Sequence, residues 1–139
     1  MDSKIELPKG YVPSDSEDFM NALQKEYFRR KLQAWKDEIL RESKSTLSAL
    51  QQDVGTLPDL ADRASTETDR SLELRARDRQ RKLISKIDAA LRRIEEDNYG
   101  YCEETGEPIS LARLDARPVA TLSLEAQERH ERSERVHRD

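Results

Sequence analysis

The sequence predicts a mostly α-helical fold: a long antiparallel two-helix coiled coil, a small globular knob and a C-terminal helix. Hydrophobic residues make up 35% of the 139 residues and charged residues 39%. That balance suits a narrow apolar seam between two helices better than a thick core. Apolar residues recur at alternating steps of four and three in two long stretches, as in coiled coils. The linker between them is short, so the helices are expected to be antiparallel.

The first part of the chain, residues 1–17, is expected to form an N-terminal strap that packs on the globular part. It holds two prolines and a glycine and has no helical period. Ser14 and Glu17 have the spacing of a capping box, in which a hydroxyl and a carboxylate satisfy the free amides of a first helical turn. A helix is therefore expected from about residue 18 to residue 53.

Residues 18–98 are expected to form the coiled-coil arm, with its tip at residues 55–66. A glycine and a proline in the linker end the first helix, and Ser65 or Thr66 is expected to cap the second. The seam of the first helix is predicted to contain Phe28, Leu32, Trp35, Ile39 and, after a more polar interval, Leu50. The seam of the second is predicted to contain Leu72, Ala76, Leu83, Ile87, Ala90 and Ile94.

Residues 99–139 are expected to form a degenerate zinc-finger-like globular region and a C-terminal helix. Gly100 is free to take the left-handed conformation that ends the second arm helix. The last helix is expected from about residue 123 to residue 137. The knob is predicted to be built from Tyr99, Tyr101, Ile109, Leu111, Leu114 and Val119.

Four positions in this region have the spacing C-x2-C-x17-C-x2-C of a four-cysteine zinc site: Cys102, Thr105, Ser123 and Ala126. Only Cys102 is a cysteine, and both histidines lie outside these positions. Hydroxyl groups are poor zinc ligands and alanine is none. We therefore expect no zinc, and we expect the hydroxyls of Thr105 and Ser123 to meet near Cys102.

Composition excludes several classes of protein. The net charge is −4, with 25 basic and 29 acidic residues, which argues against a general nucleic-acid binder. The chain has no apolar run near the roughly 18 residues of a membrane span and no signal-peptide pattern at its start, so a cytoplasmic protein is expected. It has no nucleophile–base set and no glycine-rich phosphate loop, so no enzyme is expected.

The linker between the two helices carries two carboxylates. Residues 57–68 read L-P-D-L-A-D-R-A-S-T-E-T, and a hairpin of two helices carries Asp59 and Asp62 to its far end. A long arm with acids at its end suggests a reach into a narrow place. The structural alternative is that Asp59 favours a turn and Asp62 neutralises a helix start.

Several segments, in order along the chain, carry a resemblance to one family. They are F-R-R-K-L-Q-A-W (28–35), P-D-L-A-D-R-A in the linker, S-L-E-L-R-A-R-D-R (71–79), R-K-L-I-S-K-I (81–87), Y-G-Y-C-E (99–103) and R-L-D-A-R-P (113–118). The chain resembles the DksA family of bacterial transcription factors from about residue 19 to its end. Its depleted cysteine set resembles the family's zinc-independent form.

The resemblance implies a non-catalytic regulator of transcription initiation. Members of the family enter the secondary channel of RNA polymerase, and the chain is expected to bind core or holoenzyme as a monomer without contacting DNA. It would act at ribosomal RNA and amino-acid-type promoters together with ppGpp in the stringent response. The alternatives are an elongation-type secondary-channel factor and a coiled-coil adaptor that does not bind polymerase.

The resemblance also implies two sets of polymerase contacts. The tip is expected to approach the active centre of polymerase through Asp59, Asp62 and Ala64. The rim of the channel entrance is expected to receive three cations that share one side of the second helix: Arg75, Arg79 and Lys82. The alternative for these cations is a solvated helix face with Glu73 and Asp78 as partners.

A ppGpp site at the polymerase interface is implied by three further residues. Lys86 and Arg117 match the family's ppGpp-binding cations, and Leu83 matches an apolar neighbour. Two cations suit a diphosphate, arginine as a planar fork and lysine as a point charge. Gln127 stands where the family has a further basic residue. The alternatives are a surface role for Lys86 and a structural contact for Arg117.

Overall fold

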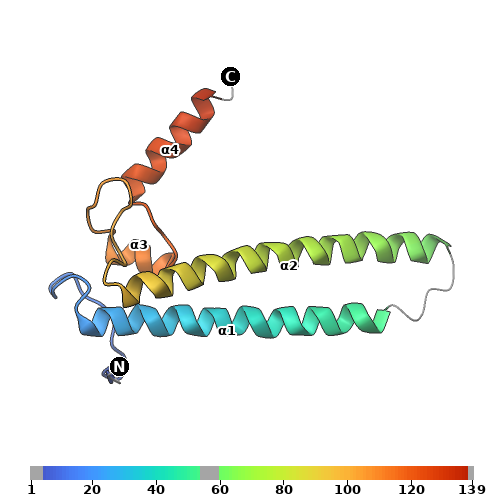
Figure 1. The fold of residues 1–139 in the computed structure, drawn as a ribbon, viewed down its shortest axis with the longest axis horizontal. Helices are drawn as coiled ribbons and strands as arrows, with labels where there is room; N and C mark the ends of the chain where they lie inside the picture. Colours follow the sequence, from blue (N-terminus) through green and yellow to red (C-terminus); the bar gives the residue numbers. More distant parts are fainter. Residues whose placement is uncertain (1–4, 54–59, 138–139) are drawn as a thin grey trace. The chain divides into compact units, whose positions relative to one another are not determined.

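The computed structural model describes residues 5–53 and 60–137, and the side chains of residues 46–65 and of residue 137 lie outside the description. The helices are α1 (Ala22–Asp53), α2 (Leu60–Glu95), α3 (Leu111–Ala116) and α4 (Leu124–His137) (Figure 1). The described part is mostly helical, as predicted, with two long helices that pack together. No helix in it is both long and apolar enough to cross a membrane.

The chain divides into two compact units. The base unit consists of Met1–Gln33 with Ile87–Asp139, and the arm unit is Ala34–Lys86. The two long helices contribute to both units. In the base unit Lys25 Nζ pairs with Asp97 Oδ1 at 2.6 Å, and in the arm unit Ser43 Oγ donates to Gln80 Oε1 at 2.7 Å. As α1 advances, its partners in α2 and in the turn that follows it go backwards along the chain, which is the order of an antiparallel pair.

The start of α1 differs from the prediction. The backbone N–H of Gln24 donates to Asn21 Oδ1 at 2.8 Å, so Asn21 supplies the cap. The predicted capping pair closes a turn before the helix, in which the Ser14 N–H donates to Glu17 Oε1 at 3.2 Å. Met20 has a φ of +53°, and a helix cannot continue through a left-handed residue. The prediction of a start near residue 18 is therefore wrong.

The seam of α1 is confirmed where its side chains are described. Phe28 and Leu32 are fully buried in the base unit, and Ile39 is buried in the arm unit. Trp35 is half-buried between these positions. The predicted seam residue Leu50 lies outside the described side chains. Spacings of four, three and four therefore mark the face that α1 turns towards α2.

The seam of α2 is confirmed at five of the six predicted positions. Those five are buried or half-buried: Ala76, Leu83, Ile87, Ala90 and Ile94. Leu72 was wrongly assigned, because its side chain is 55% exposed. Steps of four and three counted back from Ile94 arrive at Glu73, which is half-buried. The helical repeat, and not the hydrophobicity of the neighbouring residue, determines which position faces α1.

The start of α2 differs from the prediction as well, but here the helix begins earlier than predicted. The helix begins at Leu60 and not at Ser65 or Thr66. Leu60, Ala61 and Ala64 are strong helix formers, so helical backbone is favourable before the two hydroxyl residues are reached. The capping preference of Ser and Thr was therefore a misleading start signal.

The end of α2 is a Schellman motif centred on Asp97. The N–H of Asn98 donates to Arg93 O at 2.9 Å, and the N–H of Asp97 donates to Ile94 O at 3.2 Å. Asp97 has a φ of +61°, a conformation that aspartate tolerates because its short side chain can bond locally. The left-handed cap is therefore Asp97, and the prediction that Gly100 fills this role is wrong.

Gly100 has a different role, in the contact between the segment before α1 and the loop after α2. Its φ is +93°, and a Cβ added there would lie 3.1 Å from Phe19 Cζ and 3.2 Å from Met20 Cε. A side chain would be strained by the backbone conformation and would also crowd Phe19. Glycine at this position therefore allows Phe19 and Met20 to approach the loop.

The knob contains most of the predicted core. The confirmed buried residues are Tyr99, Ile109, Leu111 and Leu114. Tyr101 was wrongly placed there, because it is 39% exposed and contacts Phe19 edge-on at a centroid distance of 5.4 Å. Val119 is half-buried. An isolated β-bridge pairs Tyr101 with Pro108, so the backbone of Tyr101 is fixed while its ring lies at the surface.

Two serines begin the helices of this region. Ser110 Oγ accepts a hydrogen bond of 3.2 Å from the Arg113 N–H at the start of α3, a helix that the sequence analysis did not predict. Ser123 Oγ accepts one of 3.2 Å from the Ala126 N–H at the start of α4. α4 was predicted within one residue of its observed start.

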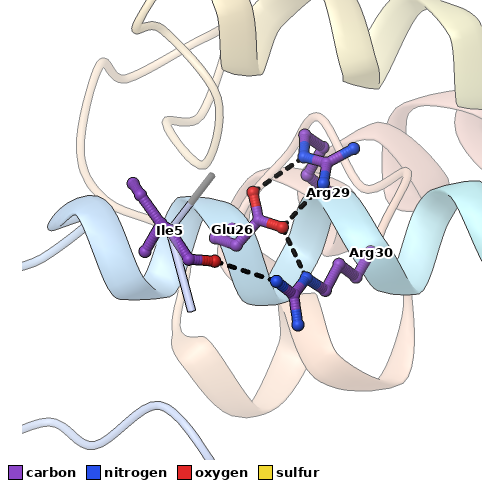
Figure 2. A network of polar contacts seen from close by, with 4 residues as sticks. All are labelled: Ile5, Glu26, Arg29 and Arg30. Atoms are coloured by element: carbon purple, nitrogen blue, oxygen red, sulfur yellow. Dashed lines mark hydrogen bonds and ion pairs between the residues drawn. The ribbon is translucent and has the colours of Figure 1, made fainter. Parts of the chain in front are cut away.

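The segment before α1 is tied to the helix by a polar network (Figure 2). Glu26 is buried, and its carboxylate accepts hydrogen bonds of 2.8 and 2.6 Å from Arg29 and a further one from Arg30. Arg30 Nη2 also donates to Ile5 O at 2.8 Å. The hydrogen bonds from Arg29, together with the one from Arg30, outweigh burial and hold the pKa of Glu26 below its usual value. Glu26 therefore orients an arginine that anchors the N-terminal segment.

Candidate functional site

The predicted tip residues lie at the limit of the structure. Asp59 lies outside the described residues. Asp62 and Ala64 belong to the first turns of α2, and their side chains lie outside the description. Their roles therefore stay predictions that rest on the sequence.

The predicted rim-docking cations are exposed side chains of α2 in the arm unit. Arg75, Arg79 and Lys82 have exposed side chains, and their spacing places them on one side of the helix. The proposed structural partners are used elsewhere: Asp78 Oδ1 lies 3.5 Å from Arg81 Nη1, and Glu73 is half-buried at the seam. The arrangement leaves a positively charged helix face available to an external partner.

The predicted ppGpp residues belong to different units. In the arm unit Leu83 is half-buried and Lys86 is exposed. In the base unit Arg117 is exposed and ends α3, where its N–H donates to Arg113 O at 2.7 Å. Gln127 in α4 donates from Nε2 to Glu131 Oε1 at 3.2 Å. A neutral amide that is hydrogen-bonded within its own helix replaces the basic residue that the family resemblance led us to expect.

The backbone on the N-terminal side of Arg117 is anchored to α1. Asp115 Oδ1 accepts a hydrogen bond from the Tyr27 hydroxyl and another from Lys31 Nζ, each at 2.6 Å. Lys31 lowers the pKa of Asp115, and the bond to Asp115, with burial, raises the pKa of Tyr27 to about 12. A charged acceptor and two donors therefore hold α3 against α1.

The backbone on the C-terminal side of Arg117 is anchored as well. The Tyr99 hydroxyl donates a buried hydrogen bond of 2.7 Å to Pro118 O, and the ring of Tyr99 packs on Phe28 at a centroid distance of 5.6 Å. Arg117 therefore projects from a short segment that is held on both sides. The sequence analysis missed Tyr27, Lys31 and Asp115. The helix α3 was not predicted, and Asp115 is separated from Lys31 by 84 positions and from Tyr27 by 88, so no local sequence pattern indicates these contacts.

Cys102 is 2% exposed. Two of the other three positions with zinc-site spacing, Thr105 and Ser123, lie next to its thiol. Burial by itself raises the pKa of Cys102. Hydrogen bonds from the Thr105 hydroxyl and from backbone N–H groups, including that of Ser123, outweigh burial and lower the pKa to about 6. The lowered pKa agrees with the predicted approach of Thr105 to Cys102. Ser123 acts on the thiol through its backbone N–H, while its hydroxyl caps α4. That the two hydroxyls meet near Cys102 stays a prediction.

The loop that follows Cys102 also makes polar contacts with α4. His130 Nε2 lies 2.9 Å from Glu104 Oε1, and Arg129 Nη2 lies 3.8 Å from Glu104 Oε2. Ala126 on the inner side of α4 is fully buried. These contacts fix a helix that has few other apolar residues to bury.

Two family models match the chain. The first is described as "DnaK suppressor protein DksA, N-terminal domain" and matches residues 24–94. The second is described as "Prokaryotic dksA/traR C4-type zinc finger" and matches residues 97–132. Together they cover both arm helices and the knob.

Similar proteins agree with the family models. A Caulobacter vibrioides protein named "RNA polymerase-binding transcription factor DksA" is 72% identical over 93% of this chain and 91% of its own length. Proteins of the same name from Haemophilus influenzae and Escherichia coli K12 are 44% and 43% identical; the matches cover 84% and 83% of this chain, and 81% and 76% of theirs. The solved structure of DksA2 from Pseudomonas aeruginosa is similar with a TM-score of 0.79 and 41% identity, covering 88% of this chain and 93% of that one.

The zinc-finger match corrects our expectation about the metal. We expected a zinc-independent form without zinc, whereas residues 97–132 match a C4-type zinc finger model, which suggests zinc binding. At the four positions with the zinc-site spacing, Cys102 is the one thiol. Among the described residues, no group of three or more His, Cys, Asp or Glu side chains is arranged to hold a metal ion. The side chains at these positions do not form a four-thiolate site, and we assign no functional step to a metal.

Proposed function

Because the chain belongs to the DksA family of non-enzymatic, RNA polymerase-binding transcription factors, we propose that it binds polymerase through the secondary channel and regulates transcription initiation together with ppGpp. The observation that carries the proposal is 72% identity, over 93% of this chain, to a relative named for polymerase binding. We propose that it acts in the cytoplasm as a monomer and does not contact DNA directly.

The exposed cationic face of α2 supports a docking role. Arg75, Arg79 and Lys82 have no hydrogen bond or ion pair to another described residue, so their charges are available. Exposed ion pairs contribute little to the stability of an isolated protein, but charges of one sign steer a complementary surface into place and set its register. We assign these residues to the rim of the channel entrance.

The two carboxylates of the linker are assigned to the active centre of polymerase, with Ala64 beside them. Asp59 and Asp62 are acceptors that can bond to basic elements or approach a magnesium ion. Ala64 is small enough for a close approach. The support for this assignment is the sequence of the linker and its position between two long paired helices.

The ppGpp response is assigned to Leu83, Lys86 and Arg117. The exposed lysine supplies a point charge and the exposed arginine a bidentate fork, and each of these suits a phosphate group. The anchored backbone around Arg117 supports this role, because a held backbone reduces the conformational freedom that ligand binding must remove.

The test is multi-round transcription from a ribosomal-type promoter, with and without ppGpp. The parent chain is compared with an Asp59→Asn/Asp62→Asn double variant, which keeps side-chain size and removes both charges. We expect polymerase binding to persist and regulation to fall. Unchanged regulation would remove the two acids from the mechanism, and failure of the parent chain to co-purify with core polymerase would overturn the proposed function.

A further inference from the structure

Leu72 is an apolar residue of α2 that the helix pair does not bury. Its side chain is 55% exposed although it was expected in the seam. It belongs instead to a second line of residues at successive steps of four, three, four, three and four. These residues are all exposed: Thr68, Leu72, Arg75, Arg79, Lys82 and Lys86. Such spacing keeps side chains on one side of a helix, so Leu72 adjoins the cationic face.

An open hollow lies beside this leucine within the arm unit. Its lining residues all belong to α2: Glu67, Thr68, Ser71, Leu72 and Arg75. Leu72 forms an apolar wall, the two hydroxyl side chains of the lining are short, and the remaining two lining residues, Glu67 and Arg75, are charged. A side chain protruding from a partner therefore has space to contact Leu72.

The charges next to the hollow indicate the chemistry of the partner. Arg75, Arg79 and Lys82 have no hydrogen-bonding or ion-pair partner among the residues that the structure describes. Three such cations in a line favour an acidic surface. Binding surfaces combine a desolvated apolar anchor with a charged rim, and the anchor contributes more of the affinity than the rim charges do.

We propose that Leu72 is the apolar anchor of this face, and that an acidic surface of RNA polymerase seats an apolar side chain against it in the hollow. The inference rests on the proposed function. It adds an apolar contact residue, which the pattern of charges on α2 does not identify. The cations guide the approach and orientation, while burial of Leu72 slows dissociation. The exposure of the Leu72 side chain in the free protein is explained by its burial in the complex with polymerase.

The test compares Leu72→Ala with Leu74→Ala. Leu74 is a matched control, because it is 50% exposed on the same helix and does not line the hollow. Alanine is the strongest helix former, so neither change weakens α2, and circular dichroism and thermal melting verify this. The dissociation constant for core polymerase is then measured for both variants and for the parent chain at two salt concentrations.

We expect Leu72→Ala to weaken binding about 10-fold, the effect of losing one well-buried apolar side chain, and to leave the salt dependence unchanged. Leu74→Ala is expected to bind like the parent chain. Parent-like binding by Leu72→Ala, or an equal loss in both variants, overturns the inference and leaves the proposed function intact. Failure of the parent chain to bind polymerase overturns both.

Discussion

The Tyr27 hydroxyl lies 2.6 Å from Asp115 Oδ1 and donates a hydrogen bond to it, although the two residues are 88 positions apart. Lys31 Nζ donates to the same oxygen at 2.6 Å and also lies 5.7 Å from the centre of the Tyr27 ring. This contact joins the first turns of α1 to α3. It therefore links the packing of the base unit to the segment that displays Arg117.

The first prediction concerns the stability of this contact. Tyr27→Phe removes a hydroxyl that donates to a charged acceptor, and we expect it to lower the free energy of unfolding by about 1–2 kcal/mol. Urea unfolding measures the change. Tyr101→Phe is the control, because the Tyr101 hydroxyl has no hydrogen-bond partner among the described residues, and it is expected to unfold like the parent chain. An equal effect of the two substitutions would contradict the importance of the Tyr27–Asp115 bond.

The second prediction concerns ppGpp. Lys86→Ala and Arg117→Ala are each expected to reduce the effect of ppGpp on transcription while leaving regulation without ppGpp intact, because each removes one cation from an anion site. Transcription at increasing ppGpp concentrations gives the concentration for half the effect. Lys44→Ala serves as the control, since Lys44 is an exposed lysine of α1. A ppGpp response that is unchanged in both variants would remove these residues from the site.

The third prediction separates two effects of glycine replacement. Gly100→Ala forces a side chain into a φ of +93° and places its Cβ 3.1 Å from Phe19 Cζ, whereas Gly106→Ala meets a similar φ of +74° with no atom within 4 Å. We expect Gly106→Ala to cost about 1 kcal/mol from backbone strain and Gly100→Ala to cost more. Free energies of unfolding measure the difference. A loss for Gly106→Ala as large as that for Gly100→Ala would show that contact with Phe19 is unimportant.

The helical pairing was predictable because it has a local period. Apolar residues at steps of four and three identified Phe28, Leu32 and Ile39 in α1, and Ile87 and Ile94 in α2. The prediction failed where hydrophobicity and register disagreed, since Leu72 is apolar but lies one position away from the repeat. Periodicity is therefore reliable along a helix only when the spacing is given precedence over residue type.

Helix ends and the site were less predictable. Ser14 and Asn21 are both good caps, and the left-handed backbone of Met20 determined which one begins α1. The approach of Thr105 to Cys102 followed from their spacing, whereas the choice of the Ser123 N–H over its hydroxyl depended on where α4 starts. The expectation of no zinc was wrong because it considered the four ligand positions one at a time. The match to the zinc finger model extends over the whole of residues 97–132.

The last prediction concerns acid. Asp115, Glu26 and Glu17 each have a pKa below its usual value, chiefly because of hydrogen bonds from Lys31, Arg29 and Gln24 respectively. A carboxyl group with a depressed folded-state pKa stabilises the fold fully above its unfolded value, which is 3.8 for Asp and 4.5 for Glu. That stabilisation is lost as the pH falls through the folded value.

We therefore expect the contribution of these three carboxylates to the free energy of unfolding to be nearly constant from neutral pH down to about 5, and to fall steadily below that as they take up protons. Cys102, whose pKa is lowered to about 6, adds a separate decline between neutral pH and 6. Urea unfolding at a series of pH values measures the curve. Glu26→Gln removes one of the three groups, so its curve should lie lower at neutral pH and fall less steeply in acid. Parallel curves for the parent chain and this variant would contradict the assignment, because a group that contributes to acid sensitivity must alter the slope when its charge is removed.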